Sequence, residues 1–166
     1  MTRIITIASG MAGCGKSHLA INLAAEFVRK GRLVGLYHDD RGHASIDRLL
    51  QLPRVAAPRS SPDNDNVVCH GYQGLDVISS RYPLASWNTL DAALLAALVS
   101  AHEAWKGYDD FLIDTSGMSP RGVIACCLLS QPVVLIVTPQ AQSQAEAFAL
   151  LKVLQLNGFD SPVFLS

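Results

Sequence analysis

The sequence predicts one α/β domain over residues 1–166, built as a doubly wound, mainly parallel sheet with helices on both faces. Three observations support this prediction. Short apolar segments rich in β-branched residues alternate with longer segments of helical periodicity. A glycine-rich turn joins the first apolar segment to the first helix. The chain is 166 residues long and 49% hydrophobic, which is enough for one domain with a substantial core.

The first elements form a strand–helix–strand unit. Residues 3–9 ("RIITIAS") are apolar and β-branched and predict a strand. Apolar residues almost encircle residues 17–30 ("SHLAINLAAEFVRK"), which predicts a buried helix that ends at Gly31. Residues 32–37 ("RLVGLY") then predict a second strand, parallel to the first.

The middle of the chain is less regular. A polar loop is followed by a short helix, for which Ser45 is the predicted cap. Residues 53–66 are rich in Pro, Ser, Asp and Asn and predict a mobile surface loop. Residues 74–80 ("GLDVISS") predict a strand, and residues 88–105 predict a strong helix.

The last third returns to the alternation. Residues 108–114 ("YDDFLID") predict a strand that ends in an acid, and residues 132–139 ("PVVLIVTP") predict a central, fully apolar strand. Ser143 and Glu146 have the spacing of a capping box. The final predicted elements are a helix at 143–158 and a strand at 161–166.

Charge and cysteine usage exclude several classes of protein. The net charge is -1 and the isoelectric point is about 6.5, so no global basic field suggests a nucleic-acid partner. No signal peptide or membrane-length apolar run is visible, so we expect a cytoplasmic protein without an intrinsic membrane anchor. The four cysteines lack metal-ligand spacing and are expected to be reduced thiols: Cys14, Cys69, Cys126 and Cys127.

Residues 10–17 ("GMAGCGKS") match the phosphate-loop pattern G-x-x-x-x-G-K-[ST] in full, between a strand and a helix. Glycines let such a loop curl around an anion, and the helix adds its positive end. Lys16 is expected to reach the β- and γ-phosphates, and Ser17 is expected to hold Mg²⁺. The predicted nucleotide-binding residues are Gly10, Met11, Ala12, Gly13, Cys14, Gly15, Lys16, Ser17 and His18.

Acidic residues follow two of the predicted strands. Asp114 ends an apolar strand, where a Walker B carboxylate would help to hold Mg²⁺ at the carboxyl edge of the sheet. Asp39 and Asp40 follow another strand, and either is a candidate for orienting the attacking water. His38 and His43 lie nearby, but no further ligand completes a set, so no separate metal site is predicted.

These motifs together resemble the MinD/ParA family of P-loop ATPases, and within it the flagellar-number regulators called FlhG or FleN. The family loop K-G-G-V-G-K-T corresponds to "MAGCGKS", and the later segments "YHDDRGHASIDRLLQL", "GLDVISS" and "YDDFLIDTSGMS" also resemble family motifs in order and spacing. The likeness runs from Ile4 to about Leu154.

The resemblance implies a function and roles for particular residues. Family members bind ATP and Mg²⁺, form a face-to-face dimer, and bind a partner, a membrane surface or DNA until hydrolysis releases them. Lys16 and Ser17 would contact the phosphates and Mg²⁺, and Asp40 would orient the water and stand near the metal. Asp114 would be the Walker B acid, and Gly117 would lie near the γ-phosphate.

Three departures from the family pattern bear on catalysis. Met11 replaces a lysine that the resemblance places across the dimer on the partner's phosphates, and methionine carries neither charge nor a strong donor. His38 replaces the first acid of D-x-D. Family members continue with further strand–helix units, so we expect a C-terminally short sheet without the family's adenine-contacting segment. Weak or absent turnover is expected unless a partner supplies the missing groups.

The sequence is compatible with several functions. The first is a MinD-like, ATP-binding switch that controls placement, number or assembly of a cell-surface structure, with the flagellum as the first guess. It would act as a homodimer or with a protein partner, which could recruit it to the inner face of the membrane. The second is a catalytically impaired docking subunit of a larger assembly. A small-molecule kinase and a DNA-partition ATPase are further alternatives, and neutral charge disfavours the last.

Overall fold

The structure is a computed structural model that describes residues 2–39, 46–51, 55–56, 66–70, 74–80 and 107–166. The strands are β1 (Arg3–Ala8), β2 (Val34–Asp39), β3 (Val55–Ala56), β4 (Asn66–His70), β5 (Leu75–Ser80), β6 (Asp110–Asp114), β7 (Val133–Leu135) and β8 (Val163–Leu165). The helices are α1 (Lys16–Arg29), α2 (Ile46–Leu49), α4 (Pro120–Leu129) and α5 (Ala141–Leu156).

The strands form an eight-stranded sheet in the order β3-β4-β5-β2-β6-β1-β7-β8. Pairing is parallel from β5 to β8, whereas β4 runs antiparallel to both β3 and β5. The predicted mainly parallel α/β sheet is therefore confirmed. β1 and β2 are parallel as predicted, but β6 lies between them and pairs with both.

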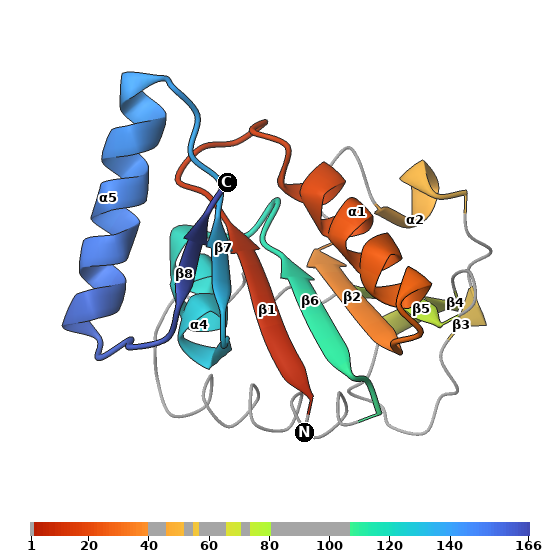
Figure 1. Ribbon diagram of the computed structural model, residues 1–166. Helices are drawn as coiled ribbons and strands as arrows, with labels where there is room; N and C mark the ends of the chain where they lie inside the picture. The colour runs from red at the N-terminus through yellow and green to blue at the C-terminus, as the bar shows by residue number, and fades with distance from the viewer. Residues whose placement is uncertain (1, 40–45, 52–54, 57–65, 71–73, 81–106) are drawn as a thin grey trace.

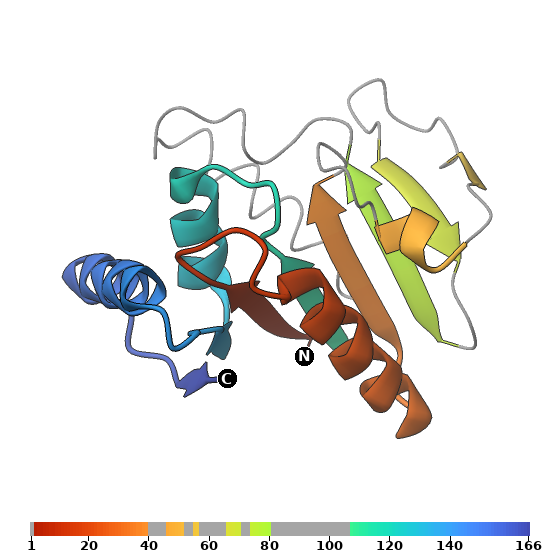
Figure 2. The same ribbon diagram turned by 90° about the horizontal axis from the view of Figure 1, so that it is seen from above.

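Helices cover both faces of the sheet (Figures 1 and 2). α1 lies on one face, where Ala20 and Ala24 pack against Ile5 and Ile7 of β1 in one buried cluster. α4 and α5 lie on the other face, on the side of the sheet where β7 and β8 stand. Alternate residues of β1 point to opposite faces, so its carboxyl end is held between two packed layers. Among the described helices, none combines the length and hydropathy needed to cross a bilayer.

The start of β6 is anchored by a charged cluster. The Asp110 carboxylate is fully buried and accepts a hydrogen bond of 2.7 Å from Arg3 Nε on β1. Arg32, just before β2, forms an ion pair with the other Asp110 oxygen. Because these residues come from three segments, the cluster holds neighbouring strands together at the edge opposite the phosphate loop.

Several predicted elements were wrong or incomplete. The region predicted as a loop at 53–66 contains β3, and β4 begins at its last residue. Neither strand was predicted, because β3 has only two residues within a segment rich in Pro and Ser, and β4 begins at the Asn- and Asp-rich end of that segment. β7 ends at Leu135, earlier than predicted. The helix predicted at 88–105 and Ser45, the predicted cap of α2, lie outside the described residues.

Two errors concern helices α4 and α5. Helix α4 was not predicted, although Ser119 caps it by accepting a hydrogen bond of 3.2 Å from the Gly122 N–H, and Pro120 is its first residue. The capping box in α5 is wrong: the helix begins at Ala141 after Gln140. Ser143 is instead buried inside the helix and accepts a hydrogen bond of 3.0 Å from the Thr138 N–H.

Candidate nucleotide-binding site

The loop that follows β1 has the backbone shape expected of an anion cradle. Gly13 and Gly15 have φ angles of 73° and 92°, in the left-handed region that favours glycine. Gly15 is the N-cap of α1, and no side chain forms a capping hydrogen bond there. The first N–H groups of a helix lack intrahelical partners, and the first turn of α1 carries no acid. This helix end therefore suits an anionic ligand.

Lys16 is folded back into the loop. Its ammonium donates to the Met11 carbonyl at 2.9 Å and to Ser9 Oγ at 3.3 Å, and it lies 3.8 Å from Cys14 Sγ. Lys16 is only 8% exposed. A buried ammonium requires such acceptors, and incoming phosphate oxygens would be stronger acceptors than a carbonyl.

Ser17 and Asp114 meet at the carboxyl edge of the sheet. The Ser17 hydroxyl donates to Asp114 Oδ2 at 2.6 Å, and the Ser116 N–H donates to Asp114 Oδ1 at 3.0 Å. Ser17 Oγ is also 3.1 Å from Ser116 Oγ. Asp114 stands beside Ile7 in the parallel register of β1 and β6, which places it next to the loop after β1. The fold thus brings together two of the residues that the sequence assigned to Mg²⁺.

Sequence reasoning missed two polar residues of this site. Ser9 Oγ contacts Lys16, accepts from the Met11 N–H at 3.0 Å, and lies 2.8 Å from Cys14 Sγ. Thr115 donates from Oγ1 to the Ile7 carbonyl at 2.8 Å and so holds the start of the loop after β6 against β1. The phosphate-loop pattern begins at Gly10, so it gave no sign of Ser9; a small polar residue at the end of the strand is the signal that was available.

The remaining predicted residues differ in how the structure places them. His18 lies exposed in the first turn of α1. Gly117 has a φ of 83° in the loop after β6 and lies near Met11 and Lys16 around one pocket. His38 is buried and stands beside Asp114 in the register of β2 and β6. Asp40, the predicted catalytic acid, lies outside the described residues, directly after the end of β2 at Asp39.

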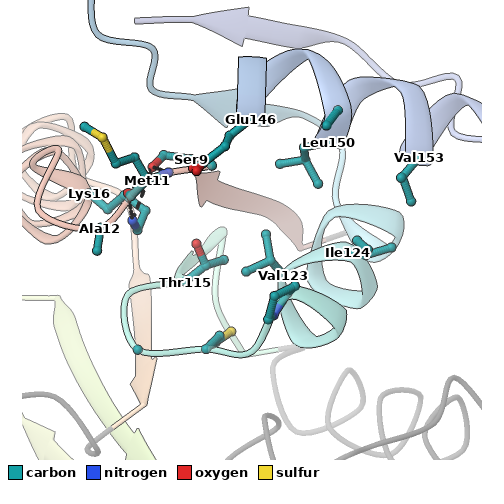
Figure 3. Close-up of a pocket in the computed structure, with 15 residues that line it drawn as sticks. Ser9, Met11, Ala12, Lys16, Thr115, Val123, Ile124, Glu146, Leu150 and Val153 are labelled. Atoms are coloured by element: carbon teal, nitrogen blue, oxygen red, sulfur yellow. Dashed lines mark hydrogen bonds between the residues drawn. The ribbon is translucent and has the colours of Figure 1, made fainter. Parts of the chain in front are cut away.

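A pocket of about 470 Å³ opens beside the loop (Figure 3). The loop after β1 and the loop after β6 form one end of this pocket, and α4 and α5 form its walls. Val123 and Ile124 of α4 face Leu150 and Val153 of α5, so most of the lining is apolar. The polar lining residues are Ser9, Lys16, Thr115 and Glu146.

The adjacent cysteines of α4 pack into two different hydrophobic clusters, because successive side chains of a helix point in different directions. Cys126 packs with Ile4 and Phe111, whereas Cys127 packs with Val133 and Leu135. Burial raises the pKa of the Cys126 thiol to about 12, and burial also raises the pKa of Cys127. Within the described part of the chain, no group of His, Cys, Asp or Glu has the arrangement of a metal site made by protein ligands alone.

These residues fit a magnesium–nucleotide complex by their chemistry. The uncapped start of α1 and the Lys16 ammonium supply positive potential for phosphates. Ser17 and Asp114 place a hydroxyl and a carboxylate oxygen 2.6 Å apart, and Mg²⁺ prefers oxygen ligands of this kind.

Comparison with known families gives a match over almost the whole chain. Residues 1–155 match the model of the ParA family, described as NUBPL iron-transfer P-loop NTPase. Antiactivator FleN of Pseudomonas aeruginosa is 27% identical over 157 residues, which cover 92% of this chain and 56% of the relative. Flagellum site-determining protein YlxH of Helicobacter pylori is 26% identical over 161 residues, which cover 94% of this chain and 55% of the relative. The chain thus spans little more than half the length of these relatives.

Solved structures show the same fold. MinD in the MinC:MinD cell division protein complex of Aquifex aeolicus superposes with a TM-score of 0.72 at 20% identity, over 98% of this chain and 68% of that one. MinD of Pyrococcus horikoshii complexed with Mg-ADP gives a TM-score of 0.69 at 21% identity, over 99% of this chain and 68% of that one. The resemblance to MinD and to flagellar regulators found in the sequence is therefore confirmed.

Proposed function

The chain belongs to the ParA family of P-loop NTPases, and from this premise we propose that it is an ATP-binding switch of the MinD type. It would control the placement, number or assembly of a cell-surface structure, with the flagellum favoured by the FleN and YlxH relatives. The observation that carries nucleotide binding is the contact of 2.6 Å between Ser17 and Asp114 beside the loop that holds Lys16.

Lys16 would change partners when phosphate binds. In the structure its ammonium donates hydrogen bonds to the Met11 carbonyl and Ser9 Oγ, which are both neutral acceptors. Phosphate oxygens carry a negative charge that these acceptors lack, so the exchange adds Coulomb attraction to the ammonium and favours the β- and γ-phosphates. The Met11 carbonyl would then lose the hydrogen bond from Lys16, and this loss would favour a change in the backbone conformation of the loop.

Ser17 and Asp114 would hold the magnesium ion that accompanies the nucleotide. Ser17 would give up its hydrogen bond to Asp114 and offer Oγ as a ligand, while Asp114 would act directly or through water. When bound, the ion neutralises phosphate charge and fixes the phosphates in one orientation. Asp40 would orient the attacking water, as the resemblance implies.

Met11 favours a second candidate function, that of a catalytically impaired docking subunit. Its side chain adds no positive charge to the loop, and a missing cation costs roughly 10³-fold or more in phosphoryl transfer by other NTPases. In this alternative the protein would bind nucleotide or none, and it would act by docking onto a larger assembly. In either case its partner would be a second copy of the chain or another protein.

Calorimetric titration with Mg-ATP tests nucleotide binding directly. The expected result is saturable binding by the wild type that Lys16→Ala loses and that Ser17→Ala weakens mainly when Mg²⁺ is present. Lys30→Ala is a matched control, because Lys30 is an exposed lysine at the opposite end of the same helix. Absence of binding by the wild type would refute the switch and leave the docking subunit. Phosphate release above the Lys16→Ala background would refute the docking subunit.

A further inference from the structure

We propose that the pocket between α4, α5 and the phosphate loop binds a partner's peptide segment that carries an apolar side chain next to Lys or Arg. This inference adds a partner class to the proposed switch, but the pocket itself is present without nucleotide. Its volume of about 470 Å³ lies within the range of known ligand sites, about 300–1,000 Å³.

The apolar part of the pocket is built by two helices. Val123 and Ile124 of α4 and Leu150 and Val153 of α5 face one another across it (Figure 3). Val153 is 36% exposed, so the outer end of this space is open to solvent. Burial of an aliphatic or aromatic side chain here would remove apolar surface from water on both partners.

The basic part of the segment is inferred from Glu146. This residue extends from α5 toward Ser9 and Met11 at the inner end of the pocket (Figure 3). Within the described residues it forms no ion pair and accepts a hydrogen bond of 2.8 Å from the Gln142 amide. Lys16, the other charged lining residue, is engaged by the Met11 carbonyl. Glu146 is partly exposed whereas Lys16 is buried, so the carboxylate is the more accessible of the two charges and favours a cation.

The pocket and the phosphate cradle adjoin each other and share Gly10, Met11, Ala12 and Lys16. Ser9, Gly10, Met11 and Ala12 line the pocket, whereas Gly13, Gly15 and Ser17 do not. A nucleotide on Lys16 would bring several negative charges to the inner end of the pocket. A basic side chain in the pocket would therefore bind more tightly in the nucleotide-bound state, since opposite charges at short range attract in a site that is partly shielded from water.

The backbone of Glu146 packs closely against the phosphate loop at Gly10. Gly10 lies so close to α5 that a Cβ placed on it would stand 2.2 Å from Glu146 Cβ. Any change in the loop that follows nucleotide binding thus acts directly on the helix turn that carries Glu146. This contact gives the second reason to expect that occupancy of the pocket depends on the nucleotide.

Two dipeptides test the proposal on ¹⁵N-labelled protein by amide chemical-shift titration. Acetyl-leucyl-arginine amide is compared with acetyl-leucyl-citrulline amide, which has nearly the same shape without the charge. We expect shifts at Met11, Gly117, Val123, Ala149 and Val153, and affinity for the arginine peptide roughly twofold to fivefold higher. Glu146→Gln should remove that difference. A non-hydrolysable ATP analogue with Mg²⁺ should increase it.

Matched variants separate the pocket from unspecific binding. Ala149 is an exposed lining residue, so Ala149→Trp should fill the pocket and abolish the shifts without unfolding the protein. Gln155→Trp adds the same side chain at an exposed position that does not line the pocket, and it should bind like the wild type. Equal affinity for the two peptides, shifts centred elsewhere, or binding that survives Ala149→Trp would overturn the proposal. Because the first titration contains no nucleotide, failure of ATP binding leaves this result interpretable.

Discussion

Replacement of Gly10 by alanine tests the close packing between the phosphate loop and α5. The added Cβ would stand 2.2 Å from Glu146 Cβ and 2.8 Å from the Glu146 carbonyl carbon. Ordinary contacts begin at 3.4 Å, so the loop and the helix must separate by about 1.2 Å to restore one. The obstacle includes backbone, and α5 is anchored by Ala147 and Leu154 against β7, so it cannot move freely. Overpacking of this kind costs about 1–3 kcal/mol.

Urea unfolding without nucleotide measures this cost, and Gly107→Ala is the matched control. A Cβ at Gly107 meets nothing within 4 Å, and its φ is not positive. Alanine there should stabilise the protein by about 0.4–1 kcal/mol through the unfolded state. The two variants should therefore differ by about 1.5–4 kcal/mol in the free energy of unfolding. If Gly10→Ala unfolds at the same urea concentration as the control, the loop and α5 are not in contact as described.

Two further predictions concern residues remote from the loop. Asp110→Asn should lower the free energy of unfolding by about 1–3 kcal/mol in urea titrations, since Arg3 and Arg32 lose a buried anionic partner; the exposed variant Asp160→Asn should have no effect. The raised pKa of Cys126, from an ordinary 9.0 to about 12, means that the unfolded thiol ionises first as the pH rises. The stability that this thiol contributes should be present below pH 9 and be lost between pH 9 and about 12, and Cys126→Ala should reduce that slope in unfolding curves. A slope unchanged by the variant would contradict the assignment.

The order and type of the main elements followed from local pattern. Alternating apolar segments predicted β1, β2, β5, β6 and β8, and helical periodicity predicted α1 and α5, because each pattern reflects burial along a single element. Where local propensity was weak, the prediction failed. In α4, Gly122, Val123 and Ile124 lower helix propensity, and the helix is stabilised by burial of Ala125, Cys126 and Cys127 instead. The Ser119–Pro120 start was a signal that could have identified it.

The sequence by itself determined the chemistry of the candidate site. Glycines at positions that need left-handed backbone, a lysine and a hydroxyl at the start of a helix, and an acid at the end of an apolar strand all follow from short-range spacing. Such features depend on turn geometry and residue type, which neighbours in the chain decide. They also carried the resemblance to the MinD/ParA family.

Only the tertiary structure decided which of these residues meet. β6 inserts between β1 and β2, and this strand order brings Asp114 within 2.6 Å of Ser17, 97 positions away in the chain. The spacing of Ser143 and Glu146 had suggested a capping box. Instead, the packing of α5 against Gly10 places Glu146 at the phosphate loop. Strand order and helix docking depend on burial of apolar surface between distant segments, summed over many side chains. The periodicity of a single segment does not reveal which other segment it packs against.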